Sequence, residues 1–205
     1  MDTILRGILL GLSITAPIGP TNVEIIRRGA RGGWKSARAF CLGVIVVLVV
    51  YLLLVVLGLS FLTESKIFNM ILTVLGVIVL AYLSYNSLRD FFSGKEIELG
   101  EDESGNQHFV PGVILTISNP AILLLWTGIM GADLAASGAS LGQGLMLSTG
   151  ILLGVFIFFT LLIFLIHFGR KFLQQRYIRY VSLLAGIVLM GFCIHFVYGL
   201  WVQIF

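Results

Sequence analysis

The stretch Ser13–Asn22, with the sequence SITAPIGPTN, lies inside the first long apolar segment and decides how that segment folds. Pro17 and Pro20 fall close together in it. A proline inside a helix removes a backbone donor and clashes with the preceding turn, which costs about 3 kcal/mol. The residue before a proline also avoids the helical region. We therefore predict that the first segment is a helix broken near its middle.

The whole chain is as apolar as this segment. Of its 205 residues, 58% are hydrophobic and only 11% are charged, and the mean hydropathy is +1.04. A soluble domain has about 25% charged residues and a largely polar surface. The composition therefore excludes an ordinary soluble enzyme and indicates an integral membrane protein. The net charge of +3 is too weak an excess to suggest a nucleic-acid partner.

The sparse charges divide the chain into long uncharged segments. A membrane helix needs about 20 apolar residues, and continuously apolar segments favour helices over a membrane barrel. The apolar stretch after Arg6 has no small-x-small cleavage site behind it, so we expect it to be retained as a membrane helix. The six predicted helices lie near residues 3–28, 37–62, 67–89, 109–132, 143–169 and 179–203.

An acidic, glycine-containing connection over residues 90–107 divides the chain into a first half, 1–89, and a second half, 108–205. Each half holds three predicted helices, and an odd number of spans gives the two halves opposite orientations. The predicted fold is an all-α integral membrane protein. Its six transmembrane helices form a 3+3 inverted repeat, in which helices 1 and 4 are broken at proline motifs.

The basic residues are unevenly distributed between the connections. Eleven of the 13 Lys and Arg residues fall in the first, third and fifth connections, and only Arg6 and Lys66 fall on the other side. Cytoplasmic loops carry an excess of Lys and Arg. We therefore predict a multi-pass protein of the inner or plasma membrane, with these three connections cytoplasmic, both termini outside and lipid around the spans.

A second proline motif, Thr116–Pro120 (TISNP), interrupts the helix that opens the second half. Past each break a new half-helix begins, near Pro20 and near Pro120, and its first amides carry a partial positive charge that suits a carboxylate. The unpaired carbonyls before each break suit an ammonium group. The predicted substrate-binding residues are Pro17, Gly19, Pro20, Thr21, Asn22, Glu24, Ser118, Asn119 and Pro120.

Glu24 is the one charged member of this set, and two interpretations of it remain open. An acid in a membrane span is a functional candidate by default, so Glu24 is a partner for a substrate ammonium or a carrier of a coupling proton. Alternatively, it favours the dipole of the half-helix and pairs with Arg27 or Arg28, which lie three and four positions further on.

These motifs resemble the signatures of a known family. The block Pro17–Asn22, followed by Arg28-Gly29 and Gly33-Trp34, is similar to the first conserved block of the LysE/RhtB family of amino-acid exporters, and Asn119-Pro120 is similar to its second. The resemblance implies a secondary exporter of amino acids or related small metabolites, which works by alternating access and uses the proton motive force. The resemblance also implies that the partners are an amino acid and protons, and it implies no cofactor.

One departure from the family pattern concerns the substrate. Members that export basic amino acids often carry an acid a few positions after the Asn-Pro pair, whereas Ala121–Trp126 (AILLLW) contains none. A neutral or less polar amino acid is therefore as good an expectation as lysine or arginine. The pair Gly150 and Gly154 is compatible with helix packing or with a homodimer.

Three rival functions are less well supported. A heavy-metal or divalent-cation exporter of the same superfamily shape needs carboxylates, histidines or cysteines inside the spans, and these are nearly absent, so no metal site is predicted. A membrane enzyme or redox carrier needs a nucleophile with its base or a dithiol, whereas Cys41 and Cys193 lie far apart. A structural membrane protein would not need two broken helices.

Overall fold

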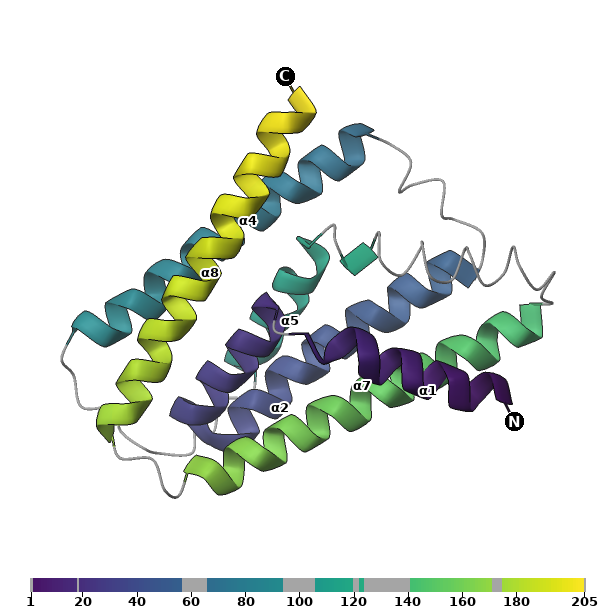
Figure 1. The fold of residues 1–205 in the computed structure, drawn as a ribbon, viewed down its shortest axis with the longest axis horizontal. Coiled ribbons are helices and arrows are strands. Elements are labelled where there is room, and N and C mark those ends of the chain that lie inside the picture. The colour runs from purple at the N-terminus through teal and green to yellow at the C-terminus, as the bar shows by residue number, and fades with distance from the viewer. Residues whose placement is uncertain are drawn as a thin grey trace.

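The computed structural model describes residues 2–17, 19–56, 66–93, 106–119, 122–123, 141–170 and 175–204. Over these ranges the chain is helix and turn, without a β-strand (Figure 1). The helices are α1 (Asp2–Thr15), α2 (Pro20–Val56), α4 (Lys66–Phe92), α5 (Asn106–Ile117), α7 (Leu141–Arg170) and α8 (Gln175–Ile204).

The helix α2 consists of two arms that meet at a single residue. Gly33 has φ 78° and ψ −171°, a positive φ that a side chain disfavours and glycine adopts freely. Figure 1 shows the chain reversing here, with the arm 20–32 running toward the lower left and the arm 34–56 running back toward the right. The first connection is therefore much shorter than the gap between the first two predicted helices.

Most predicted helices agree with the observed ones. The ranges of α4, α7 and α8 lie within four residues of the predicted helices at each end. The first predicted helix, 3–28, corresponds to α1 together with the first arm of α2. The fourth, 109–132, is described as α5 up to Ile117, and of its later part the structure describes residues 118–119 and 122–123. The predicted connection 90–107 begins within α4 and ends within α5.

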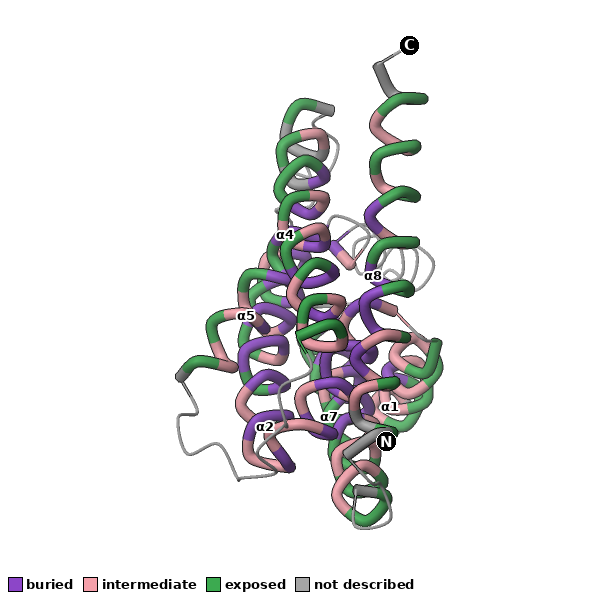
Figure 2. The backbone as a smooth tube through the Cα atoms, turned by 90° about the vertical axis from the view of Figure 1, so that its left-hand side faces the viewer, coloured by how far each residue is buried: buried purple, intermediate pink, exposed green. Residues whose placement is uncertain are grey.

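The outer surface of the molecule is that of an α-helical membrane protein. The helices α2, α7 and α8 contain stretches long and apolar enough to cross a membrane, and α1 and α5 are shorter apolar helices. Figure 2 shows that the buried positions lie where helices face one another. Large apolar side chains such as Leu165, Ile187 and Tyr198 point outward and are more than half exposed, as expected where lipid rather than water covers the surface.

Glycines allow close contact along two helix pairs. Gly11 of α1 lies against Gly154 of α7, and Gly43 of α2 lies against the backbone of α5 near Gly112. At each of these four glycines a β-carbon would overlap a carbonyl oxygen of the neighbouring helix. Small residues of this kind let membrane helices approach closely. The pair Gly150 and Gly154 of the sequence therefore packs α7 against α1 within one chain.

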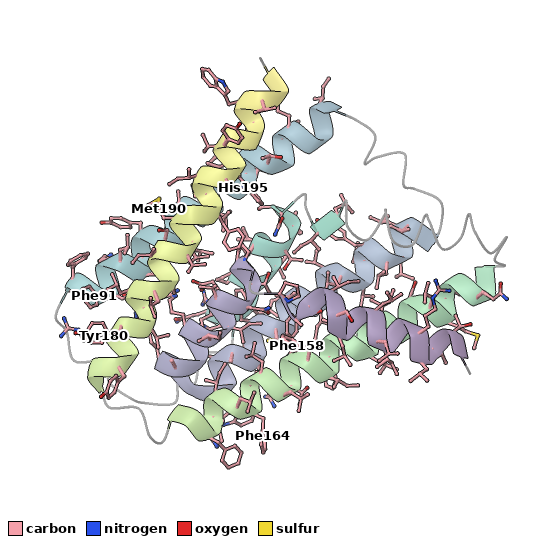
Figure 3. All side chains as sticks on the ribbon, in the orientation of Figure 1. Phe91, Phe158, Phe164, Tyr180, Met190 and His195 are labelled. Carbon is pink, nitrogen blue, oxygen red and sulfur yellow. The ribbon has the colours of Figure 1, made fainter. Side chains whose placement is uncertain are left out.

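The third helix pair, α4 and α8, is joined by side chains that bond to backbone carbonyls. The Ser84 hydroxyl donates to the carbonyl of Gly186 at 2.8 Å, and the Cys193 thiol contacts the carbonyl of Val77 at 3.6 Å. At the end of α4, the ring centroids of Phe91 and Tyr180 lie 5.9 Å apart, and Figure 3 shows where the two side chains lie on α4 and α8. These contacts hold α8 along the length of α4.

The ends of the helices fall into two groups. In Figure 1 the reversal within α2, the end of α4, the end of α7 and the start of α8 lie toward the lower left. The two chain termini lie away from this group, at the lower right and at the top. The described helix ends that flank the basic first, third and fifth connections of the sequence therefore share one end of the helix bundle.

Candidate functional site

The first helix break lies between Thr15, the last residue of α1, and Pro20, the first residue of α2. Proline is well suited to the first helical position, because its fixed φ is helical and the amide hydrogen it lacks would have no helical acceptor. The hydrogen bonding of α2 begins directly after the break, where the amide of Val23 donates to the carbonyl of Gly19 at 3.1 Å. The motif thus ends one half-helix and starts another within five residues.

Asn22 bridges this break. Its side-chain Nδ2 donates to the carbonyl of Thr15 at 2.8 Å and to the carbonyl of Pro17 at 2.9 Å. These carbonyls have lost their helical donors, and an unpaired carbonyl away from water is costly. Asn22 is buried, and within the described part of the chain no donor reaches its Oδ1. One acceptor therefore remains available beside two carbonyls that are already paired.

The second break has a similar local structure. The helix α5 ends at Ile117, whose carbonyl accepts a hydrogen bond of 3.1 Å from the Tyr51 hydroxyl of α2. After it, the amide of Asn119 reaches back to the carbonyl of Thr116 at 3.3 Å, and the amide of Ile122 donates to the carbonyl of Asn119 at 3.2 Å. The carbonyl that the break frees is thus paired by a side chain from another helix.

A cavity of about 140 Å³ lies where the two breaks meet. The first break contributes most of its polar lining, and the second break contributes Asn119. Its walls are apolar and come from the ends of the half-helices, from the second arm of α2 and from α7. The apolar lining residues are Ile14, Val44, Leu48, Ile122, Val155 and Phe159. None of the described residues that line the cavity carries a charge.

The cavity collects most of the predicted binding residues. The predicted residues that line it are Pro17, Gly19, Pro20, Thr21, Asn22 and Asn119. Ser118 is buried and follows the last turn of α5, but it does not line the cavity. Glu24 lies elsewhere, as described below, and Pro120 lies outside the described residues.

Glu24 belongs to a buried ion cluster at the end of the first arm of α2. Its carboxylate accepts from Arg27 at 2.9 and 3.1 Å and from Arg28 at 2.8 Å, and Glu24 is completely buried. Of the two interpretations of Glu24, ion pairing with the arginines one turn later is the arrangement that the side chains adopt. In this arrangement the carboxylate is occupied by two guanidinium groups.

The cluster extends to two other helices. Arg27 also donates to Asp90 of α4 at 2.9 Å, and Arg31 forms a second ion pair with Asp90. Arg28 lies 2.8 Å from Nδ1 of His108 on α5. The cluster, which we define as Glu24, Arg27, Arg28, Arg31 and Asp90, therefore connects α2 to α4 and contacts α5 through His108.

Several of these functional positions were missed by reasoning from the sequence. Asp90 falls in the predicted connection 90–107, and its pairing depends on how α4 packs on α2. Tyr51 is the only residue with a hydroxyl in an aliphatic stretch of α2, which is a signal that was present in the sequence. Phe159 offered no such signal, because it is one of many phenylalanines in α7.

The described residues contain no group of three or more His, Cys, Asp or Glu side chains that could hold a metal ion. The thiols of Cys41 and Cys193 are both free and buried. Cys193 packs against the backbone of α4, as described above, and Cys41 belongs to the apolar core.

Comparison with known proteins identifies the family to which this chain is similar. The model of the family "LysE type translocator" matches residues 12–200. A protein of Bacillus subtilis (strain 168), YcgF, whose name describes it as a candidate amino acid efflux protein, is 30% identical over 97% of this chain and 96% of its own.

A second relative carries a different kind of name. The chemotactic transduction protein ChpE of Pseudomonas aeruginosa (strain PAO1) is 27% identical over 91% of this chain and 93% of its own. No solved structure matches the chain. Both relatives and the family model extend across the two helix breaks and the cavity between them.

Proposed function

Since this chain belongs to the LysE type translocator family, we propose that it is a secondary active exporter of a neutral amino acid. The observation that carries the proposal is the central cavity, where two helix breaks from different halves of the chain meet around an uncharged lining. Broken helices at mid-membrane are typical of substrate sites in secondary transporters.

The cavity offers separate partners for the two charged groups of an amino acid. At the start of α2 the amides of Thr21 and Asn22 lack helical acceptors, and the helix dipole there favours a carboxylate. The Oδ1 of Asn22, whose Nδ2 is occupied by the two carbonyls before the break, suits the ammonium group. Both groups of the substrate are therefore met without a charged side chain.

The walls of the cavity favour an apolar or small substrate side chain. Val44, Leu48, Val155 and Phe159 present only hydrocarbon. A cationic or anionic side chain in such a site would lose its hydration without gaining a counterion, which is strongly unfavourable. We therefore assign a neutral amino acid to the site, ahead of lysine, arginine, aspartate or glutamate.

The proposal includes an inverted repeat, and the packing of the glycines supports it. A shift of 101 residues carries Ile8 of α1 to Phe109 of α5, and a shift of 111 carries Gly43 of α2 to Gly154 of α7. Gly154 lies against the carbonyl of Ile8, and Gly43 lies against the carbonyl of Phe109. The shift of 101 also carries Gly11 of α1 to Gly112 of α5. Gly11 lies against a backbone carbonyl of α7 and Gly112 against one of α2, and the shift of 111 relates these two carbonyls.

The pair α4 and α8 supports the same relation. A shift of 109 residues carries Ser84 to Cys193 and Val77 to Gly186. Ser84 donates to the carbonyl of Gly186, and Cys193 contacts the carbonyl of Val77. Each contact is thus the counterpart of the other after the two halves are exchanged. Two such halves can rock against each other around a shared site, which is the basis of alternating access.

We further propose that the export is driven by the proton motive force, as the family resemblance implies, and that the first, third and fifth connections face the cytoplasm. The grouping of the helix ends that flank these connections at one end of the bundle supports the orientation. We assign Glu24 to the ion cluster rather than to the substrate, because both of its carboxylate oxygens are engaged by arginines.

The proposal is tested by efflux from preloaded proteoliposomes. We expect efflux of neutral amino acids such as alanine and leucine, faster with a pH gradient, and little efflux of lysine or glutamate. Protein-free liposomes and liposomes without the gradient are the controls. If lysine and glutamate leave as fast as leucine, the assignment of substrate class is wrong. If no amino acid moves in either direction, the exporter proposal fails and metal ions are screened next.

A further inference from the structure

A second cavity, separate from the central one, lies between α2, α4 and α5. Its volume is about 540 Å³. Arg27 and Arg28 line its polar end together with His108, and Ile78, Tyr82 and Ile114 line its apolar end. We call this cavity the lateral slot. None of the residues that line the central cavity lines the lateral slot.

The polar end of the lateral slot is lined by guanidinium groups. Arg27 and Arg28 belong to the ion cluster, which contains three guanidinium groups, from Arg27, Arg28 and Arg31, and two carboxylates, from Glu24 and Asp90. A guanidinium group that faces a cavity can donate a charge-assisted hydrogen bond to an anion.

Arg28 has one nitrogen, Nη2, that is left to donate to an anion in the slot. Its Nε donates to Glu24 and its Nη1 lies 2.8 Å from His108. Among the described residues, no acceptor meets its Nη2. Arg27 differs, because its Nε, Nη1 and Nη2 are all bonded to Glu24 or Asp90. Arg28 is therefore the arginine of the slot that has a nitrogen left for a ligand.

The walls of the slot differ sharply from its polar end. Ile78 and Tyr82 of α4 are 60% and 64% exposed, and Ile114 of α5 is 45% exposed. In a membrane-spanning chain such side chains face lipid, so the slot opens sideways into the bilayer between α4 and α5. These two helices touch only briefly compared with the other helix pairs, which leaves the opening between them.

We propose that the lateral slot binds one anionic phospholipid, with its phosphate on Arg28 and an acyl chain along Ile78, Tyr82 and Ile114. Charge complementarity selects the headgroup, because a phosphate is negatively charged and accepts from the Arg28 nitrogen that the ion cluster leaves unused. Basic pockets between membrane helices are suited to anionic headgroups. The apolar walls select a lipid over a free phosphate compound.

The binding is tested by native mass spectrometry of the detergent-purified protein titrated with phosphatidylglycerol or phosphatidylcholine. We expect wild type to retain one phosphatidylglycerol at concentrations where phosphatidylcholine does not bind. Arg28→Ala removes the phosphate donor and should weaken this binding about tenfold or more, since a hydrogen bond to a charged group contributes about 1.5–3 kcal/mol. Arg38→Ala is the matched control, because Arg38 is exposed and stacks on Trp34 outside the slot.

Because Arg28 also pairs with Glu24, a second variant avoids the ion cluster. Ile114→Trp fills the apolar part of the slot and should displace the lipid with Arg28 intact. Val110→Trp, at an exposed position of the same helix outside the slot, is its control and should bind as wild type does. Selective loss in Arg28→Ala and in Ile114→Trp supports the proposal.

Three results would overturn it. Equal loss of phosphatidylglycerol in Arg28→Ala and in Arg38→Ala would mean that the positive charge of this membrane face attracts lipid without a specific site. Equal binding of free glycerol 3-phosphate would mean that the apolar walls contribute nothing. A dimer that Ile114→Trp dissociates, with no lipid bound to the monomer, would mean that a second copy of the chain covers the slot.

Discussion

Asn22 is the side chain on which the geometry of the central cavity most depends. A single amide group pairs the carbonyls of Thr15 and Pro17, which the break leaves without helical donors. The same side chain keeps its Oδ1 for a ligand. The structural role and the proposed binding role thus fall on one residue, and we expect a change of this residue to affect both.

We expect Asn22→Ala to lower the initial rate of amino-acid efflux about tenfold or more, because each unpaired carbonyl costs about 1–3 kcal/mol. Asn22→Asp should be similarly damaging, since a carboxylate of the same size cannot donate to the two carbonyls. Thr160→Ala is the control, because the Thr160 hydroxyl is exposed and bonds only within its own helix. Unchanged efflux in Asn22→Ala would show that the break tolerates unpaired carbonyls.

Glu24 has a different kind of importance. We expect Glu24→Gln to lower the free energy of unfolding by about 3–5 kcal/mol, because it leaves Arg27 and Arg28 buried beside a neutral partner. Asp90→Asn should destabilise less, since the Asp90 side chain is 27% exposed and that of Glu24 is fully buried. Thermal unfolding of the purified variants in one detergent measures both effects.

The transport phenotype of Glu24→Gln separates stability from mechanism. If the variant melts as wild type does but its efflux no longer responds to a pH gradient, Glu24 carries the coupling proton and its assignment to the ion cluster alone is wrong. If the variant is destabilised and the efflux that remains still responds to the gradient, the assignment holds.

At the scale of the element, the glycine contacts set how closely the helices pack. We expect Gly154→Ala and Gly43→Ala each to destabilise the protein by about 1–3 kcal/mol, because a β-carbon at either site overlaps a backbone carbonyl. The inverted repeat further predicts that the two losses are similar in size. Melting temperatures in detergent provide the measurement.

Gly191→Ala serves as the control for these variants. Gly191 lies in α8 and a β-carbon there would meet nothing within 4 Å. The variant should therefore melt at or slightly above the wild-type temperature, because alanine is the better helix former. A Gly154→Ala protein as stable as Gly191→Ala would contradict the close contact of α1 with α7.

The helices were largely predictable from the sequence, and their ends were less so. Pro17 and Pro20 located the first break, because proline acts locally on the backbone it belongs to. The reversal at Gly33 was harder to place, since Gly29, Gly32 and Gly33 all qualify and only packing selects one. The helix continues through Gly29, which lies close to the side chain of Ile166 on α7.

The cavity was predictable where its residues belong to the breaks and not where they come from other helices. Asn22 and Asn119 stand beside prolines in the sequence and were identified by that position. Tyr51 and Phe159 reach the site through the packing of α2 and α7, which no local pattern encodes. The pairing of Asp90 with Arg27 likewise spans 63 positions of the chain.

At the scale of the whole molecule, the position of the helix ends gives a test of orientation. Ser93 follows α4 and Gln143 lies in the first turn of α7, and both are exposed. We expect Gln143→Cys in intact cells to react with a membrane-impermeant maleimide. Ser93→Cys should react only in inside-out vesicles, because the third connection is proposed to be cytoplasmic.

The wild-type protein is the background control in this experiment. Its thiols, Cys41 and Cys193, are both buried and should react little from either side. The reverse pattern, with Ser93→Cys labelled in intact cells, would mean that the basic connections face outward. Labelling of both variants from one side would contradict a membrane crossing by the fourth predicted helix, which lies between the two positions.

The reversal at Gly33 has a mechanical consequence. Because one residue joins the two arms of α2, the connection has no slack, and neither arm can tilt without pulling the other. The first arm carries the start of the central cavity, and the second carries Val44, Leu48 and Tyr51. We therefore expect a displacement of the first arm at the cavity to move the second arm, which packs against α5.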